Sequence, residues 1–289
     1  MTYARPDALV STEWLAAHLD APDVRIVDGS FFLPAQKRDP KAEFVNQHIP
    51  GAVFFDIDDI SDHTTSLPHM LPGTAAFEEH MSALGLNSSD RVVVYDGSGV
   101  NLSAPRAWWM LRTFGHERVA VLDGGLGKWR REGRALESGK VTPGSGQFKA
   151  RLVSGAVRDL RAVRDNIGSG KEQLVDMRSR GRFFGWEPEP REGLRHGHVP
   201  GSINLPFTEL VGPDGTLLPP DELRNKLAQA GLDLARPVIA TCGSGTSACS
   251  LLLSLYSIGH TDAALYDGAW AEWGSRPDTP VECHANKPT

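Results

Sequence analysis

The hydrophobic residues of this chain fall into short runs, separated by longer stretches in which apolar and polar residues mix. Such runs are typical of strands buried on both faces, and they predict strands at 24–27, 92–95, 119–122, 174–176, 238–241 and 263–266. The stretches between them predict helices at 11–18, 77–84, 104–113, around Trp129 and at 157–166. Strands that alternate with helices indicate an α/β fold, in which a mostly parallel sheet carries helices on both faces.

This pattern occurs twice along the chain. His48-Ile49-Pro50-Gly51 recurs 150 residues later as His198-Val199-Pro200-Gly201, and Asp123-Gly124 with Trp129 recurs 144 residues later as Asp267-Gly268 with Trp273. A period of this length indicates two copies of one domain rather than a solenoid. Between the copies, the chain is rich in Gly, Ser and Pro and lacks apolar periodicity. We therefore predict an N-terminal domain over 1–138, a linker over 139–155 and a C-terminal domain over 156–289.

Composition narrows the class of protein. The 289 residues include 30 basic and 36 acidic residues, a net charge of −6, which argues against a general binder of nucleic acids or anionic membranes. No run approaches the length of a membrane span, and residues 1–19 lack the apolar core of a secretory signal. Three cysteines without a Cys-x-x-Cys pair argue against a disulfide scaffold or a zinc ribbon. A reducing, cytoplasmic location and one reactive thiol are expected.

The most informative stretch is the loop from Thr241 to Ala248. It follows an apolar strand, precedes an apolar helix, and holds Cys242-Gly243-Ser244-Gly245. Glycines allow backbone N–H groups to turn inward, and such a nest at a helix N-terminus binds an anion and favours the thiolate form of a cysteine. Because the thiolate is the nucleophile, the loop predicts covalent sulfur chemistry at Cys242. A buried structural cysteine beside a glycine turn is the alternative.

The first copy provides an internal comparison. Its strand at 92–95 is followed by Asp96-Gly97-Ser98, where the second copy has Cys242-Gly243-Ser244. An aspartate cannot act as a sulfur nucleophile. The C-terminal copy is therefore predicted to be catalytic, and the N-terminal copy to be a partner that lends residues.

Together these motifs resemble the tandem-domain rhodanese family of sulfurtransferases over nearly the whole chain. The resemblance rests on the cysteine loop, both His-[Ile/Val]-Pro-Gly segments, both Asp-Gly…Trp segments, and Gly181-Arg182-Phe183 with Pro188-Glu189-Pro190-Arg191. It implies two rhodanese-like domains and transfer of a sulfane sulfur from a donor onto Cys242. The resulting persulfide would pass to cyanide or to a thiol, such as thioredoxin or a small thiol. It also implies a monomer without cofactor or metal.

The residues after the cysteine bear on the donor. Members of the family that use thiosulfate typically place basic residues directly after the cysteine, whereas this loop has Gly243 and Ser244 and is similar to those that use 3-mercaptopyruvate and release pyruvate. Thr246 and Ser247 depart from that pattern, where Val and Thr are usual. Thiosulfate as donor, or a non-catalytic persulfide carrier, remain alternatives.

The resemblance also assigns roles to individual residues. Arg182 and Arg191 match the family's substrate-binding arginines, and guanidinium groups can bind a carboxylate bidentately. Amides of the loop, at Gly243, Gly245, Thr246 and Ser247, would stabilise the anion. Asp58 and His69 match positions that reach Ser244 from the other domain, and a Ser244-His69-Asp58 relay would protonate the departing enolate.

Several other groups carry alternative interpretations. The carboxylates at 56–62 with His63 and His69 suggest a metal site, but their spacing matches no known ligand pattern. A phosphatase of the Cys-x5-Arg type is nearly excluded, because the sixth residue after Cys242 is Ala248. Arg178 is expected to pair with Asp176, and His198 to be structural because His48 repeats it. Cys249 is expected in the core, and Cys283 in a polar tail.

Overall fold

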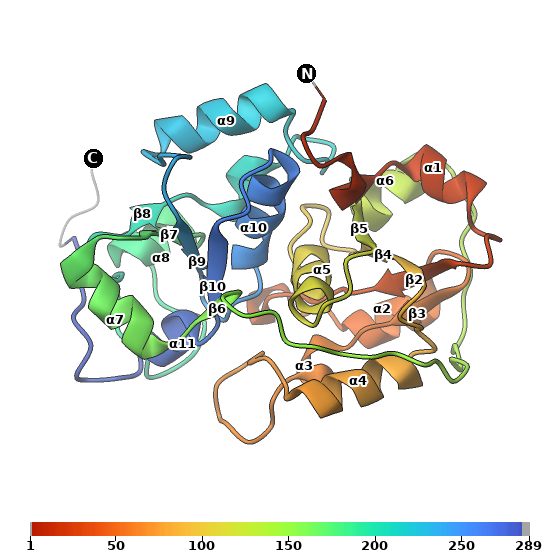
Figure 1. The fold of residues 1–289 in the computed structure, drawn as a ribbon, viewed down its shortest axis with the longest axis horizontal. Helices are drawn as coiled ribbons and strands as arrows, with labels where there is room; N and C mark the ends of the chain where they lie inside the picture. Colours follow the sequence, from red (N-terminus) through yellow and green to blue (C-terminus); the bar gives the residue numbers. More distant parts are fainter. Residues whose placement is uncertain (1, 285–289) are drawn as a thin grey trace.

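The fold consists of two similar halves, each built on a five-stranded parallel sheet (Figure 1). A computed structural model describes residues 2–284. The strand orders are β1-β5-β4-β2-β3 and β6-β10-β9-β7-β8, and all recorded strand pairs are parallel. The second order repeats the first strand for strand, so the predicted duplication and α/β fold class are confirmed.

The N-terminal half contains strands β1 to β5 and helices α1 to α6. Its strands are β1 Leu9–Val10, β2 Val24–Asp28, β3 Ala52–Phe54, β4 Arg91–Tyr95 and β5 Val119–Leu122. Its helices are η1 Pro6–Ala8, α1 Thr12–Ala17, η2 Pro34–Gln36, α2 Pro40–Asn46, α3 Ile57–Ile60, α4 Thr74–Ala83, α5 Ala104–Thr113 and α6 Gly125–Arg131. The loop from α3 to α4 extends toward the C-terminal half.

The C-terminal half repeats this arrangement after a connection without helix or strand along most of its length. Its strands are β6 Val157–Arg158, β7 Gln173–Asp176, β8 Ile203–Asn204, β9 Val238–Thr241 and β10 Ala263–Tyr266. Its helices are α7 Leu160–Ser169, α8 Arg180–Phe184, η3 Phe207–Leu210, α9 Pro220–Gln229, α10 Ala248–Ser257 and α11 Ala269–Trp273. No helix in the described range is both long and apolar enough to cross a membrane.

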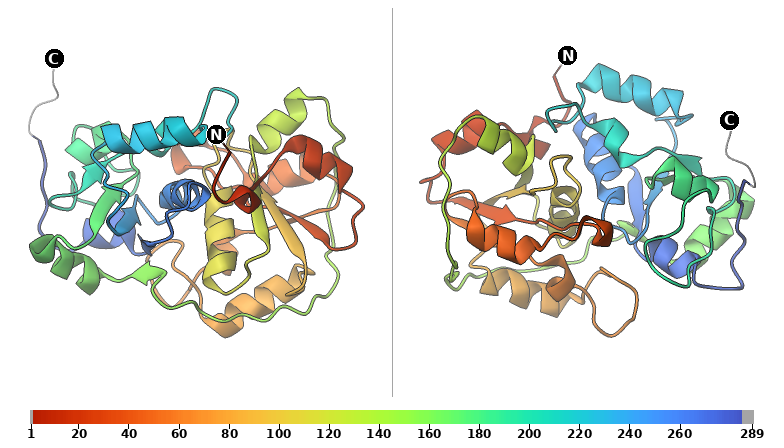
Figure 2. Two further views of the ribbon diagram at one scale, coloured as in Figure 1. Left: turned by 45° about the horizontal axis from the view of Figure 1, so that its top comes forward. Right: turned by 180° about the vertical axis from the view of Figure 1, so that it is seen from behind.

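Alternation along the strands explains how the halves join. In β4, Val92 and Val94 face the centre of the molecule, while Val93 and Tyr95 pack against helices on the outer face. The inner faces of both sheets, with α5 and α10 between them, form one continuous hydrophobic core, whereas each outer face has its own core. Figure 2 shows α5 and α10 side by side at the seam. The two halves therefore share buried surface that fixes their relative position.

The strand and helix predictions hold for the longer elements and fail at sheet edges. The predicted helix at 157–166 is wrong at its start, because Val157 and Arg158 form the edge strand β6 against β10. The helix begins only after Asp159, whose carboxylate accepts the N–H of Ala162 and caps it. The two- and three-residue strands at the edges were not predicted, since runs this short have no measurable periodicity.

The pH dependence of stability can be predicted for Asp123, which follows β5. Burial raises its pKa to about 6, and its carboxylate accepts the N–H of Leu217 from the other half at 2.8 Å. Between about pH 4 and pH 6 the folded state therefore binds more protons than the unfolded state, so this group's contribution to stability falls as the pH rises.

Asp123→Asn keeps an oxygen acceptor for Leu217 and removes the ionisation. Relative to the wild type, the variant should gain on the order of 2–3 kcal/mol in unfolding free energy between about pH 4 and pH 7. Urea denaturation of both proteins across this range measures the difference. A difference that does not change with pH would show that Asp123 is not the titrating group.

Candidate active site

The loop around Cys242 lies at the carboxyl end of β9 and leads into α10. The Cys242 side chain is buried at 2% exposure. The carbonyl groups of Cys242 and Gly243 accept N–H groups of α11, from Trp270 at 3.0 Å and from Ala271 at 2.9 Å. With these carbonyls bound behind it, the loop is held in one conformation. This is the strand-loop-helix arrangement that the sequence predicts.

The corresponding loop of the N-terminal half shows what such a loop can bind. The Asp96 carboxylate accepts backbone N–H groups from Ser98 at 2.8 Å, Ser103 at 2.9 Å and Ala104 at 2.8 Å. Its amides therefore converge on an anion that belongs to the chain itself. The Cys242 loop occupies the equivalent place with a thiol in place of the carboxylate, where a thiolate is the equivalent anion.

His69 brings the N-terminal half into the site. Its Nδ1 lies 3.0 Å from Ser244 Oγ and 3.1 Å from Thr246 Oγ1, and its Nε2 lies 3.0 Å from Asp58 Oδ1. The ring is 3% exposed and packs edge-on against Phe31 at 4.8 Å between ring centres. The hydrogen bond from His69 lowers the pKa of Asp58. The structure thus brings Ser244, His69 and Asp58 together across the two halves.

Two arginines lie near Cys242, and they differ in whether a carboxylate pairs with them. Arg182 donates to Glu189 Oε2 from NH2 at 2.6 Å and from Nε at 3.2 Å, and its guanidinium lies directly over Gly243. Arg191 is half-buried and has no hydrogen bond or ion pair with any residue in 2–284. Burial lowers the pKa of Arg191, and the negative charges of Cys242 and Asp58 oppose that effect.

A buried ion-pair chain neutralises Arg182. Glu189, whose side chain is 2% exposed, bridges Arg182 and Arg178, and Arg178 also binds Asp176 at 2.6 Å. The expected Arg178–Asp176 pair is confirmed. Two arginines and two carboxylates balance in this chain, whereas Arg191 carries a positive charge beside Cys242 that no ion pair within residues 2–284 neutralises.

The cavity over Cys242 gathers most of the predicted site residues. Its walls come from both halves and are formed by Phe31, Leu33, Leu102, Arg182, Pro190, Arg191, Cys242, Gly243, Ser244, Thr246 and Ser247. Gly245, with φ of +78°, does not line the cavity; it faces Arg106 and Asp267 on the other side of the loop.

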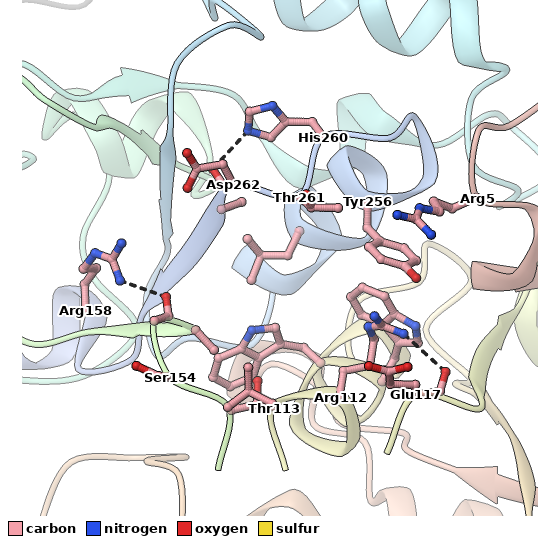
Figure 3. A pocket seen from close by; sticks show the side chains of 17 residues that line it. Arg5, Arg112, Thr113, Glu117, Ser154, Arg158, Tyr256, His260, Thr261 and Asp262 are labelled. Atoms are coloured by element: carbon pink, nitrogen blue, oxygen red, sulfur yellow. Dashed lines mark hydrogen bonds between the residues drawn. The ribbon is translucent and has the colours of Figure 1, made fainter. Parts of the chain in front are cut away.

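A separate cavity of about 590 Å³ lies beside Arg112 and Tyr256, and none of its lining residues belongs to the loop 242–247 (Figure 3).

The remaining candidates have structural environments. Cys249 is fully buried, and burial raises its pKa, so it is not a ready nucleophile; Cys283 is exposed. His198 stacks on Phe183 and its Nδ1 contacts the Phe183 carbonyl at 2.8 Å, as His48 does with Phe44 at 2.7 Å. This repeated contact confirms the structural interpretation of His198. No group of three or more His, Cys, Asp or Glu residues within 2–284 could hold a metal ion.

Comparison with known proteins decides the family. The model of the rhodanese-like domain matches residues 11–132 and again residues 159–276. The chain belongs to the rhodanese family. Both matches fall on the two halves described above, and each includes one of the paired loops, with Asp96 in the first and Cys242 in the second.

Relatives within the rhodanese family cover the same two-domain length. The human 3-mercaptopyruvate sulfurtransferase is 44% identical over 93% of this chain and 92% of its own. A bovine thiosulfate sulfurtransferase is 41% identical over 94% of each chain. The crystal structure of the Escherichia coli 3-mercaptopyruvate sulfotransferase SseA superposes with a TM-score of 0.84 at 43% identity, over 91% of this chain and 98% of that one.

Proposed function

We propose that this protein is a 3-mercaptopyruvate sulfurtransferase that works through a persulfide on Cys242. The observation that carries the proposal is the charge balance beside Cys242, where Glu189 neutralises Arg182 and Arg191 has no ion-pair partner among residues 2–284. One free positive charge suits the single carboxylate of mercaptopyruvate better than the two negative charges of thiosulfate. The names of the human and Escherichia coli relatives support the same donor.

The first half-reaction transfers sulfur to the enzyme. Arg191 and Arg182 hold the donor carboxylate and carbonyl and direct its sulfur toward Cys242. The Cys242 thiolate attacks that sulfur and forms an S–S bond, while the carbon–sulfur bond breaks and its electron pair leaves on the pyruvate enolate. Loop amides from Gly243 to Ser247 stabilise the negative charge of the persulfide.

The leaving enolate needs a proton to become pyruvate. Ser244 lies between the cavity and His69, so its hydroxyl can give a proton to the enolate carbon and recover one from His69 Nδ1. Asp58, 3.0 Å from Nε2, stabilises the imidazolium from which that proton comes. Thr246 Oγ1, at 3.1 Å from the same Nδ1, fixes the plane of the ring.

In the second half-reaction an acceptor attacks the outer sulfur and restores the Cys242 thiolate. Phe31, Leu33 and Leu102 give the cavity an apolar wall on the side of the N-terminal half. The proposed acceptor is a thiol, such as that of thioredoxin or a small molecule, or cyanide. A thiol acceptor must be kept in its reduced form, as thiols are in the cytoplasm, so a cytoplasmic location is part of the proposal.

A comparison of donors tests the proposed function. We expect kcat/KM for 3-mercaptopyruvate to exceed that for thiosulfate by at least about tenfold, the effect of roughly 1.4 kcal/mol from one mismatched charge. Initial rates of pyruvate and of sulfite release measure the two reactions. A preference for thiosulfate would assign the other donor, and a persulfide that forms on Cys242 without turnover with either donor would indicate a carrier.

A further inference from the structure

A buried ion pair crosses between the two halves beneath the relay. Arg106, the third residue of α5, is 0% exposed, and its NH1 donates to Asp267 Oδ1 at 2.7 Å. Asp267 follows β10 in the catalytic half and is 2% exposed. The pair joins α5 of the N-terminal half to the sheet of the catalytic half, and both charged groups are shielded from solvent.

The pair binds the backbone at His69 and two residues beyond it. Arg106 NH2 donates to the carbonyl of His69, and the second oxygen of Asp267 accepts the N–H of Leu71 at 2.7 Å. Arg106 NH1 also donates to the carbonyl of Gly245, within the catalytic loop, at 3.4 Å. One ion pair thus ties the segment that carries His69 to the loop that carries Ser244.

His69 needs such a restraint. Its φ is +60°, in the left-handed region that residues with a Cβ rarely adopt. A residue in this conformation persists only where its surroundings hold it there. The imidazole must remain between Ser244 Oγ and Asp58, at 3.0 Å from each, so a change in this backbone angle would move the ring out of reach of both.

The duplication provides a control within the same chain. Asp123, the counterpart of Asp267, accepts the N–H of Leu217 at 2.8 Å, just as Asp267 accepts that of Leu71. The residue two positions before Leu217 is Gly215, with φ of +79°. The third residue of α10, in the place of Arg106, is Ser250. The copy of the site around Asp96, which has no nucleophile, therefore keeps the contact between a carboxylate and a leucine N–H. In that copy glycine stands in the place of His69 and serine in the place of Arg106.

We propose that Arg106 and Asp267 are positioning residues that set the His69 imidazole against Ser244. The inference rests on the proposed function, since it assumes that His69 supplies the proton for the departing enolate. A buried ion pair is a poor source of stability compared with apolar packing. Here the pair binds backbone groups of the segment that carries His69 and of the catalytic loop, and the arginine is absent from the other copy, where no relay exists.

The test removes both charges together. Arg106→Met with Asp267→Asn leaves no unpaired buried charge and keeps an acceptor oxygen at 267. We expect kcat for 3-mercaptopyruvate to fall roughly tenfold to a hundredfold, because a displaced His69 would protonate the pyruvate enolate more slowly.

A reaction without an enolate is the control. Discharge of a Cys242 persulfide, loaded with inorganic polysulfide, to dithiothreitol should be unchanged, because no enolate is protonated in that reaction. Arg112→Met, on the same helix but against Tyr256, is the matched control and should leave both rates unchanged.

A double-mutant cycle with His69→Ala separates positioning from structure. In the His69→Ala background the paired substitution should have no further effect, because its target is gone. Losses that add, or an equal loss in the persulfide discharge, would overturn the inference and indicate a structural role. If His69→Ala slows pyruvate release and the paired variant does not, the inference alone fails. If His69→Ala has no effect, the proposed relay fails first and the inference with it.

Discussion

Replacing Cys242 with serine should abolish sulfur transfer from every donor. A serine hydroxyl at this position cannot form a persulfide, and the cradle of amides stabilises an anion that the hydroxyl does not supply. We expect turnover to fall by on the order of 10⁴-fold or more, the usual cost of losing a covalent nucleophile. Pyruvate release from 3-mercaptopyruvate measures this, and intact-protein mass spectrometry should show no added sulfur on the variant.

Cys283 provides the control for this experiment. Cys283→Ser changes an exposed thiol and should leave both turnover and persulfide formation as in the wild type. The 242 side chain is buried but small, so Cys242→Ser should keep the unfolding midpoint close to that of the wild type. Retained turnover in Cys242→Ser would mean that sulfur passes through another group and that the loop has been misassigned.

The sequence predicts the parts of this site that are local. The strand, the glycine loop and the helix around Cys242 are contiguous, so their roles can be inferred from one stretch, and the repeat at Asp96 identifies the catalytic copy. Asp58 and His69 came only through the family resemblance, because no pattern in the sequence places residue 69 beside residue 244. Their contact depends on how the halves pack, which single-sequence periodicity does not encode.

The buried residues that form ion pairs behind the site were not predicted from the sequence. Arg106 lies between Pro105 and Ala107 in an apolar helix, and a charge at such a position is a signal that a buried partner exists. Its partner Asp267 is 161 residues away, however, so the pair could not be named. Glu189 belongs to a segment that carries the family resemblance, but nothing in the sequence assigns it a partner. Its burial, and so its effect on Arg182, requires the folded loop.

The two halves also explain why one site is catalytic and the other is not. At Asp96 the amide cradle is filled by a side chain of the same loop, so no external anion can enter. At Cys242 the cradle lines a cavity that the guanidinium of Arg191 also lines, and this guanidinium has no ion pair among residues 2–284. Specialisation of one copy therefore leaves the other free to supply His69, Asp58 and Arg106 across the seam.

Replacing Arg191 with methionine should have the second-largest effect. Within the described residues 2–284, Arg191 has no ion-pair partner, whereas Arg182 already shares its charge with Glu189. Without Arg191 the donor carboxylate would enter a half-buried site with no unpaired cation to bind it. We expect kcat/KM for 3-mercaptopyruvate to fall roughly a hundredfold, equivalent to about 3 kcal/mol for a lost hydrogen-bonded charge pair.

Three variants test this assignment by initial rates. Arg182→Met should cost less than Arg191→Met, since its charge is already compensated. Arg191→Lys should recover part of the loss, because it restores the charge without the bidentate geometry. Arg180→Met removes an exposed arginine that pairs with Glu209 outside the cavity, and it should have no effect. If Arg191→Met left kcat/KM unchanged while Arg182→Met lowered it, the carboxylate would bind Arg182, and the charge balance drawn from Glu189 would be wrong.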